Sequence, residues 1–173
     1  LIAFDQDEDA FRNDIDDERF TLVRQNFKYV QNVLLSRGIN KVDGILADLG
    51  VSSHQFDTPE RGFSYRFDGE LDMRMNTSSS TTAFQVVNEY DEPNLVRILV
   101  SYGEFKRGEA RKIFRKIEEN RSVKSIKTTG DLQEILEPIF PARFLNKNLS
   151  KIFQSIRIEV NEEMQALKEL LNQ

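Results

Sequence analysis

The segment from Asp43 to Asn76 constrains the fold of this chain more than any other part of it. A short apolar run, residues 44–47, ends on Asp48, and a long loop rich in glycine, serine and arginine follows. Open α/β sheets bind ligands in loops at the carboxyl ends of their strands. A compact domain rarely keeps a structureless loop of this length without a function. We therefore predict a strand over residues 44–49 and an active-site loop over residues 48–76.

The residues before this loop alternate between strand and helix patterns. Apolar runs predict strands at residues 1–4 and 20–23, and helical spacing predicts a helix from Phe27 to Leu35 that stops near Gly38. A third strand at residues 44–49 would complete a strand–helix–strand–helix–strand order. That order implies parallel pairing in a doubly wound sheet, so the predicted fold class is α/β and Rossmann-like.

From Thr81 onward the sequence predicts helices only. A typical N-cap residue precedes each of three helical patterns: Thr81 or Thr82, Asp91, and Thr128 or Thr129. A basic helix is expected over residues 109–120, and a last helix from about Leu149 to the end of the chain. These elements predict three segments: 1–80 as part of a Rossmann-like domain, 81–148 as an all-helical insert that binds RNA, and 149–173 as a helix returning to the first domain.

Composition excludes several classes of site and of protein. With no cysteine and one histidine, His54, a disulfide framework, a metal site or a histidine-dependent triad is not expected. No apolar run approaches the roughly 20 residues that span a bilayer. We expect no signal peptide and therefore expect a cytoplasmic protein. The strand pattern at Leu1 and the uncapped helix at Leu167–Gln173 lead us to expect a chain cut at both ends.

Charge is distributed unevenly along the chain. The net charge is -5, yet residues 97–127 hold 10 basic and 4 acidic residues. A basic segment in an acidic chain indicates contact with a polyanion, although a solvated helix face would carry the same pattern. The candidate RNA-binding residues of this segment are Lys106, Arg107, Arg111 and Arg115.

Three side chains after predicted strands suggest a nucleoside-shaped ligand. Asp5 and Asp48 would each end a strand, where a carboxylate accepts hydrogen bonds from ribose hydroxyls. Both residues could equally be helix caps. Phe27 follows the second strand, where it could cover an adenine ring or simply belong to the core.

The loop carries a longer pattern with a known counterpart. Five parts of the loop together resemble the signature of the bacterial small-subunit (16S) rRNA cytosine-N4 methyltransferases: Asp48–Ser53, Gln55, Glu60–Ser64, Asp68-Gly69 and Leu71–Met75. Segments elsewhere in the chain also resemble that family, in order: Leu1–Ala10, Tyr102–Glu104, Phe153–Ile158, Val160-Asn161 and Glu163.

The resemblance implies an S-adenosylmethionine-dependent enzyme that methylates the exocyclic N4 of a cytidine in small-subunit rRNA, free or in the small ribosomal subunit. Carried over by matching motif, the cofactor contacts would be Asp5, Phe27, Asp48 and Gln55. His54 stands where the family usually has proline, and the family's glycine-rich segment would precede Leu1, so we expect residues 1–173 alone to be inactive.

The reaction needs a further set of side chains. Its nucleophile, the N4 amine, must be held in line with the methyl group, so acceptors for its protons are required. Asp48 would supply one, and Ser52 and Ser53 would position the base. Arg61 and Arg74 belong to the signature loop and are candidate RNA contacts.

Other classes of protein remain alternatives. A DNA amino-methyltransferase would share the cofactor-binding edge of the sheet, and a non-catalytic RNA-binding or assembly protein would keep the sheet alone. A nicotinamide-dependent enzyme would also use Asp5, but the loop at residues 48–75 argues against it.

Overall fold

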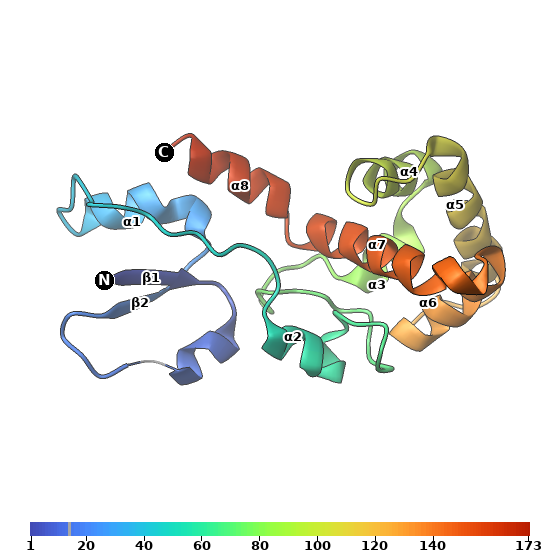
Figure 1. Ribbon diagram of the computed structural model, residues 1–173, viewed down its shortest axis with the longest axis horizontal. Helices are drawn as coiled ribbons and strands as arrows, with labels where there is room; N and C mark the ends of the chain where they lie inside the picture. Colours follow the sequence, from blue (N-terminus) through green and yellow to red (C-terminus); the bar gives the residue numbers. More distant parts are fainter. Residues whose placement is uncertain (14) are drawn as a thin grey trace. The chain divides into compact units, whose positions relative to one another are not determined.

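The computed structural model describes residues 1–13 and 15–173, and its contacts divide the chain into two compact units. The strand unit comprises residues 1–50, 75–78 and 162–173. The helical unit comprises residues 51–74 and 79–161. Figure 1 gives the order of the elements, and each unit is described by itself below.

The strand unit is built on a parallel pair of strands. Strands β1 (Ile2–Asp5) and β2 (Thr21–Arg24) pair in the register Ile2 with Thr21 through Asp5 with Arg24. A 3-10 helix, η1 (Glu8–Asn13), lies in the connection between them. The two strands confirm the predictions at residues 1–4 and 20–23, each displaced by one residue, and the mixture of strands and helices confirms the α/β class.

The predicted helix after the second strand is also present. A 3-10 turn, η2 (Phe27–Tyr29), leads into α1 (Val30–Ser36). The Asn26 side chain begins this element by accepting the Lys28 backbone N–H at 3.0 Å. Gly38 follows with φ +75°, a conformation that glycine adopts at little cost after a helix.

The predicted third strand is wrong. Residues 43–50 form no strand, and the side chains of Ile45 and Leu46 are 66% and 97% exposed. A strand is stable only when its backbone pairs with a neighbour. No such partner for this segment occurs among the residues that the structure describes, so an apolar run alone does not make a strand here. Asp48 therefore does not end a strand in this structure.

The helical unit contains five α-helices of seven or more residues: α3 (Ala83–Glu89), α4 (Glu92–Ser101), α5 (Arg107–Arg121), α6 (Thr129–Leu136) and α7 (Ala142–Val160). A 3-10 turn, η4 (Glu137–Ile139), joins α6 to α7. The predicted caps are confirmed at Thr82, Asp91 and Thr128, each accepting a backbone N–H three residues later.

Helix α7 lies at the centre of this unit and packs against α3 and α4, while α5 packs against α4 and α6. Its inward side chains are almost fully buried, among them Leu149, Ile152 and Ile156. The basic helix α5 is amphipathic: Ala110, Ile113, Phe114 and Ile117 are buried, while Arg107, Arg111 and Arg115 face solvent. This burial explains why a strongly charged segment is helical.

The expectation of one last helix beginning near Leu149 is also wrong. Helix α7 begins at Ala142, directly after Pro141, and ends at Val160, and α8 (Glu163–Leu171) is a separate helix in the strand unit. Glu162 has φ +49°, which is incompatible with a continuous right-handed helix. The Asn161 amide donates to the Met73 carbonyl at 2.7 Å and to the Arg157 carbonyl at 2.9 Å. A long-range contact thus ends the helix.

The signature loop is not structureless, contrary to expectation. It contains α2 (Ser53–Asp57) and a 3-10 turn, η3 (Pro59–Arg61). Its second half reaches the core of the helical unit, where Leu71 and Met73 are 2% and 0% exposed. The Leu71 N–H donates to the Lys127 carbonyl at 3.0 Å, next to the start of α6. The loop therefore forms part of the helical unit's core.

Candidate functional site

Polar side chains gather where β1 and β2 end. Asp5 is the last residue of β1, and Gln6 follows it. The Gln6 Oε1 accepts a hydrogen bond from the Asn26 amide at 2.9 Å, and Asn26 stands just before Phe27. The sequence pattern had suggested Asp5 and Phe27 as site residues, but not Gln6 or Asn26. Their signal was available: both are polar residues that closely follow predicted strands.

The Asp5 carboxylate is held by its own turn. Its Oδ1 accepts the Asp7 backbone N–H at 2.8 Å. Partial burial raises the pKa of Asp5 above its ordinary value, and the charge of nearby Asp7 acts in the same direction, against the hydrogen bonds from the backbone N–H groups of Asp7 and Gln6. A carboxylate has a second oxygen, which can accept hydrogen bonds from hydroxyl groups.

Phe27 supplies an aromatic ring beside these polar groups. It is half-buried at the first position of η2, which packs against α8. Lys28 pairs with Glu162 at 3.6 Å, and the Gln31 N–H donates to the Gln173 side chain at 2.7 Å. These contacts fix the segment after β2. A ring and a carboxylate at the ends of neighbouring parallel strands suit a nucleoside, whose base and ribose they could contact.

The remaining predicted cofactor and catalytic residues lie elsewhere along the chain. Asp48 is exposed in the segment without secondary structure. Ser52 is the N-cap of α2: its hydroxyl accepts the Gln55 N–H at 3.2 Å, and Gln55 Oε1 accepts the Ser52 N–H at 3.0 Å. Gln55 is only 5% exposed. This capping box accounts structurally for both residues and fixes Ser53 at the first turn.

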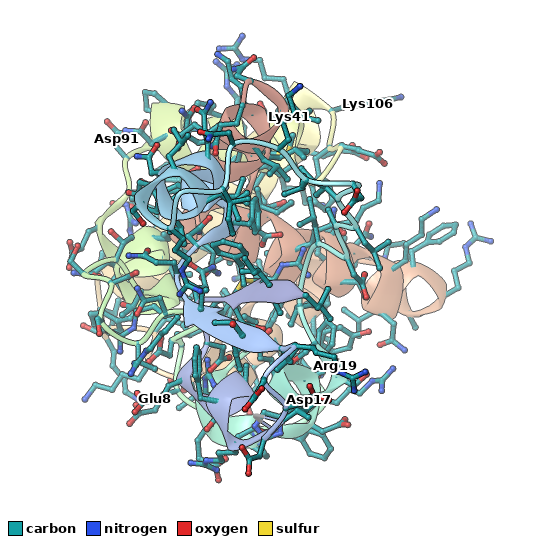
Figure 2. All side chains as sticks on the ribbon, turned by 90° about the vertical axis from the view of Figure 1, so that its left-hand side faces the viewer. Glu8, Asp17, Arg19, Lys41, Asp91 and Lys106 are labelled. Atoms are coloured by element: carbon teal, nitrogen blue, oxygen red, sulfur yellow. The ribbon has the colours of Figure 1, made fainter. Side chains whose placement is uncertain are left out.

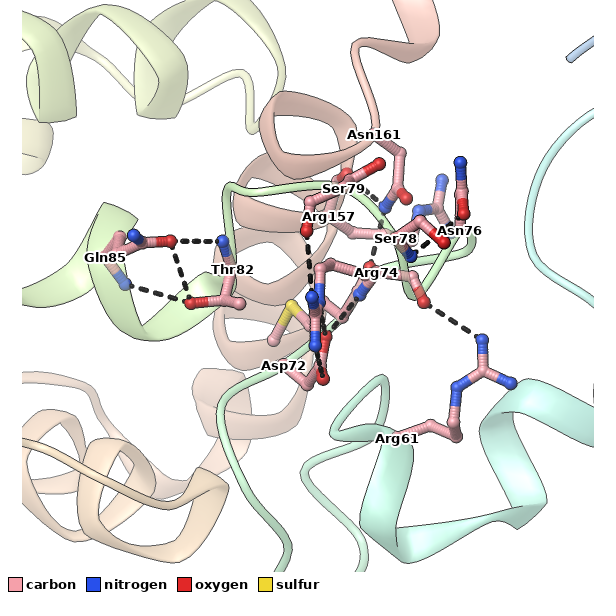
Figure 3. A network of polar contacts seen from close by, with 11 residues as sticks. Arg61, Asp72, Arg74, Asn76, Ser78, Ser79, Thr82, Gln85, Arg157 and Asn161 are labelled. Carbon is pink, nitrogen blue, oxygen red and sulfur yellow. Dashed lines mark hydrogen bonds and ion pairs between the residues drawn. The ribbon is translucent and has the colours of Figure 1, made fainter. Parts of the chain in front are cut away.

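The two arginines of the signature loop are held in a polar network (Figure 3). The Arg74 guanidinium pairs with Asp72 and donates to the Ser79 carbonyl at 2.8 Å. The Arg61 guanidinium donates to the Arg74 carbonyl at 2.9 Å and lies 5.7 Å from the centre of the Phe63 ring. Both arginines thus hold the loop in its conformation, and their role toward RNA stays a prediction.

A pocket of about 390 Å³ opens between α2, residues 63–66 and α7. Ser53 is the one predicted catalytic residue that lines it. Tyr65, Gln154 and Arg157 also line it, and sequence reasoning had given none of these three a site role. Gln154 and Arg157 lie in a segment that resembles the methyltransferase family, which was the available signal.

The four predicted RNA-binding cations at the start and along the outer face of α5 lie in solvent. Lys106, Arg107, Arg111 and Arg115 are all exposed, and Figure 2 shows the Lys106 side chain extending outward. Arg111 is paired with Glu92 of α4 at 3.1 Å. Arg107 and Arg111 also line a second pocket, of about 480 Å³, between α4 and α5. The predicted RNA-binding residues of this segment are therefore accessible to a large ligand.

The described residues contain neither a metal-binding cluster nor a membrane-spanning helix. No group of three or more histidine, cysteine or acidic side chains in residues 1–13 and 15–173 is arranged to hold a metal ion. Within the same residues, no helix is long and apolar enough to cross a membrane.

Comparison with known proteins identifies the family. The sequence model of the MraW methylase family matches residues 1–173. A protein of Flavobacterium psychrophilum is 58% identical over 173 residues, covering 100% of this chain and 59% of its own length. A Flavobacterium johnsoniae protein is 55% identical, covering 100% and 57%. One from Phocaeicola vulgatus is 54% identical over 171 residues, covering 99% and 56%.

All three relatives are named ribosomal RNA small subunit methyltransferase H. This chain spans between 56% and 59% of their length. The family match runs through the strands, the signature loop and the helical unit. These findings confirm the resemblance drawn from the loop, and the chain belongs to the MraW methylase family.

Proposed function

We propose that this protein transfers a methyl group from S-adenosylmethionine to the exocyclic N4 of a cytidine in small-subunit ribosomal RNA. The observation that carries the proposal is the family match over residues 1–173. The names of the relatives support the choice of ribosomal RNA of the small subunit, and the resemblance of the signature loop supports cytidine N4. Such a substrate implies a cytoplasmic location.

The residues at the ends of β1 and β2 fit the nucleoside part of the cofactor. Asp5 would accept hydrogen bonds from the ribose hydroxyls, and the half-buried Phe27 ring would lie against adenine. We propose Asp48 and Gln55 as further contacts. When bound, S-adenosylmethionine supplies an electrophilic methyl group on sulfur.

The protein's own task is to position a weak nucleophile. The lone pair of the cytosine amine is delocalised into the ring, so the amine must be oriented and its protons must meet acceptors. Orientation of this kind can lower a barrier by up to about 7–11 kcal/mol. We propose that Asp48 accepts a hydrogen bond from the amine, and that Ser52 and Ser53 position the base. The base must first leave its stack, at a cost of about a few kcal/mol.

The helical unit would hold the RNA. Its exposed cations Lys106, Arg107, Arg111 and Arg115 suit phosphate groups, which give salt-dependent binding without sequence preference. Arg61 and Arg74, which shape the signature loop, would act on the RNA through the conformation of that loop as well as through charge.

Methyl transfer from labelled cofactor tests the proposal directly. The full-length gene product is mixed with naked ribosomal RNA, small ribosomal subunits or DNA, and the labelled nucleoside is identified after digestion. We expect N4-methylcytidine in ribosomal RNA and no label in DNA. Asp48→Asn should lower turnover at saturating cofactor, whereas Asp43→Asn, an exposed aspartate five residues earlier in the same segment, should not.

Two outcomes would contradict the proposal. Label in DNA would make the protein a DNA amino-methyltransferase. RNA binding without methyl transfer to any substrate would make it a binding or assembly protein.

A further inference from the structure

The pocket beside α7 is lined by aromatic residues to which the proposed reaction gives no role, although Ser53 also lines it. Four aromatic side chains line it, and they come from three separate segments: Phe56 from α2, Phe63 and Tyr65 from the loop, and Phe153 from α7. Its volume of about 390 Å³ lies within the range of roughly 300–1,000 Å³ that is common for small-molecule pockets. All of its lining residues belong to the helical unit.

Two of the aromatic residues, Tyr65 and Phe153, are held in place by contacts within the protein. Phe153 is 4% exposed, and the Tyr65 ring meets it edge to face, with ring centres 5.6 Å apart and planes at 73°. The Tyr65 hydroxyl lies 3.1 Å from the Ser150 hydroxyl on the preceding turn of α7. Phe56, by contrast, is 42% exposed. A fixed ring and an exposed ring lining one pocket suit a flat ligand, because stacking needs little reordering.

Polar and cationic groups surround these rings. Arg66 and Arg157 line the pocket, and Gln154 lines it from an exposed position on α7. The Gln154 amide makes one long hydrogen bond, 3.4 Å, to the Tyr102 carbonyl. An amide carries both a donor and an acceptor, as does the edge of a nucleobase. The two guanidinium groups suit phosphate.

We propose that this pocket binds one unpaired nucleobase of the substrate RNA, next to the cytidine that is methylated. Aromatic side chains combined with cations are the usual means by which proteins hold single-stranded RNA. Ser53, which we propose to position the methylated base, lines the pocket, whereas the proposed cofactor contacts do not, so we assign the pocket to a nucleotide next to that base. The inference rests on the proposed function for the identity of the RNA.

Binding of a fluorescein-labelled oligocytidylate at several salt concentrations separates stacking from charge. Phe56→Ala should weaken binding about tenfold or more with an unchanged salt dependence, because base–aromatic stacking is not screened. Arg66→Ala should weaken binding and flatten the salt dependence by about one phosphate contact. Tyr65→Phe keeps the ring and should bind like the wild type.

Matched variants lie in the same helical unit. Phe144 is 45% exposed at the start of α7, outside the pocket, and Arg143 beside it is exposed. Phe144→Ala and Arg143→Ala should both leave oligocytidylate binding and its salt dependence unchanged. Equal effects of Phe56→Ala and Phe144→Ala would overturn the proposal.

Methyl transfer to small ribosomal subunits distinguishes failure of the pocket from failure of the proposed function. Phe56→Ala should raise KM for the subunits and leave kcat unchanged. A lower kcat at saturating subunits would put the methylated base itself in the pocket, and weaker binding of S-adenosylmethionine would assign the pocket to the cofactor; either result overturns the inference. If no variant or wild-type protein transfers methyl groups but the oligocytidylate results hold, the pocket stands and the proposed reaction fails.

Discussion

The Arg74 guanidinium donates two parallel hydrogen bonds to the Asp72 carboxylate, from Nε to Oδ1 at 2.7 Å and from Nη2 to Oδ2 at 2.9 Å. The two residues are separated by one position, and the side chain of each is 24% exposed. Met73 between them is fully buried. The pair therefore holds a turn of the signature loop against the core of the helical unit (Figure 3).

Replacing Arg74 with alanine should reduce the free energy of unfolding by about 1–3 kcal/mol at neutral pH, because a half-buried carboxylate loses its partner. Burial raises the pKa of Asp72, but the hydrogen bonds and charge of Arg74, aided by Arg61, outweigh burial and hold that pKa below its ordinary value. The stabilisation is thus complete above the unfolded pKa and is lost as pH falls through the lowered, folded pKa. Urea unfolding of wild type and Arg74→Ala from acidic to neutral pH measures the difference.

A second aspartate–arginine pair with the same sequence spacing lies on the surface and provides the control. Arg19 pairs with Asp17 through Nε at 2.9 Å and Nη2 at 2.6 Å, and both residues are labelled in Figure 2. The Arg19 side chain is 88% exposed, so Arg19→Ala should leave stability almost unchanged. Equal losses in the two variants would show that burial of the Asp72–Arg74 pair has no energetic consequence.

Gly69→Ala should prevent stable folding of the helical unit. A Cβ atom at Gly69 would overlap the Pro59 carbonyl oxygen and lie 2.8 Å from the Pro59 carbonyl carbon. Backbone atoms cannot move aside as a flexible side chain can. Gly108→Ala is the matched control, because a Cβ there meets nothing within 4 Å inside α5. It should stabilise the protein by about 0.5–1 kcal/mol. Thermal unfolding followed by circular dichroism checks both, and a stable Gly69→Ala protein would contradict the described packing.

Asn161→Asp should destabilise the protein by about 1–3 kcal/mol, since a carboxylate cannot donate to the Met73 and Arg157 carbonyls. Asn120→Asp isolates the long-range bond, because the Asn120 amide donates to the Lys116 carbonyl within its own helix. We expect the Asn161 variant to lose more stability in urea unfolding than the Asn120 variant. Equal losses would mean that the contact with Met73 does not hold the loop.

Asp5→Asn should weaken binding of S-adenosylmethionine by about 1.5–3 kcal/mol, on the order of tenfold to a hundredfold, as measured by calorimetry on the full-length gene product. Asparagine keeps an oxygen for the Asp7 N–H but loses the charge. Glu8→Gln, an exposed carboxylate paired with Arg24 at 3.0 Å, should bind the cofactor normally.

The pH dependence of the free energy of unfolding gives a second test of the role of Asp5. Burial raises the pKa of Asp5, so its favourable contribution exists below the unfolded pKa and is lost as pH rises through the folded pKa. Asp5→Asn should therefore be no less stable than wild type at neutral pH. A clear loss of stability with unchanged cofactor affinity would make Asp5 a structural residue only.

Reversing Arg107, Arg111 and Arg115 to glutamate should weaken RNA binding and flatten its salt dependence, by a slope of about 0.7 for each phosphate that the protein no longer neutralises. Arg111 is already paired with Glu92, so we expect Arg107 and Arg115 to contribute more. Arg37→Glu, an exposed arginine after α1, should have little effect. Unchanged RNA affinity and salt slope in the triple variant would show that α5 presents only a solvated face.

The sequence by itself determined the elements whose stabilising contacts are local. The caps at Thr82, Asp91 and Thr128 accept hydrogen bonds from backbone N–H groups three residues away. The helical spacing of the apolar residues in α5 likewise lies within one short segment. The two strands and the signature loop were recognised for the same reason, because pattern and composition carry that information within a short window.

Tertiary structure decided what depends on distant partners. Residues 44–49 look like a strand but lack a paired neighbour among the described residues, and Asn161 ends α7 through a carbonyl 88 positions away. Asn26 and Gln6 meet only because β1 and β2 lie side by side. Such contacts join residues that are far apart in the sequence. A local sequence pattern contains no information about which distant residues the folded chain brings into contact.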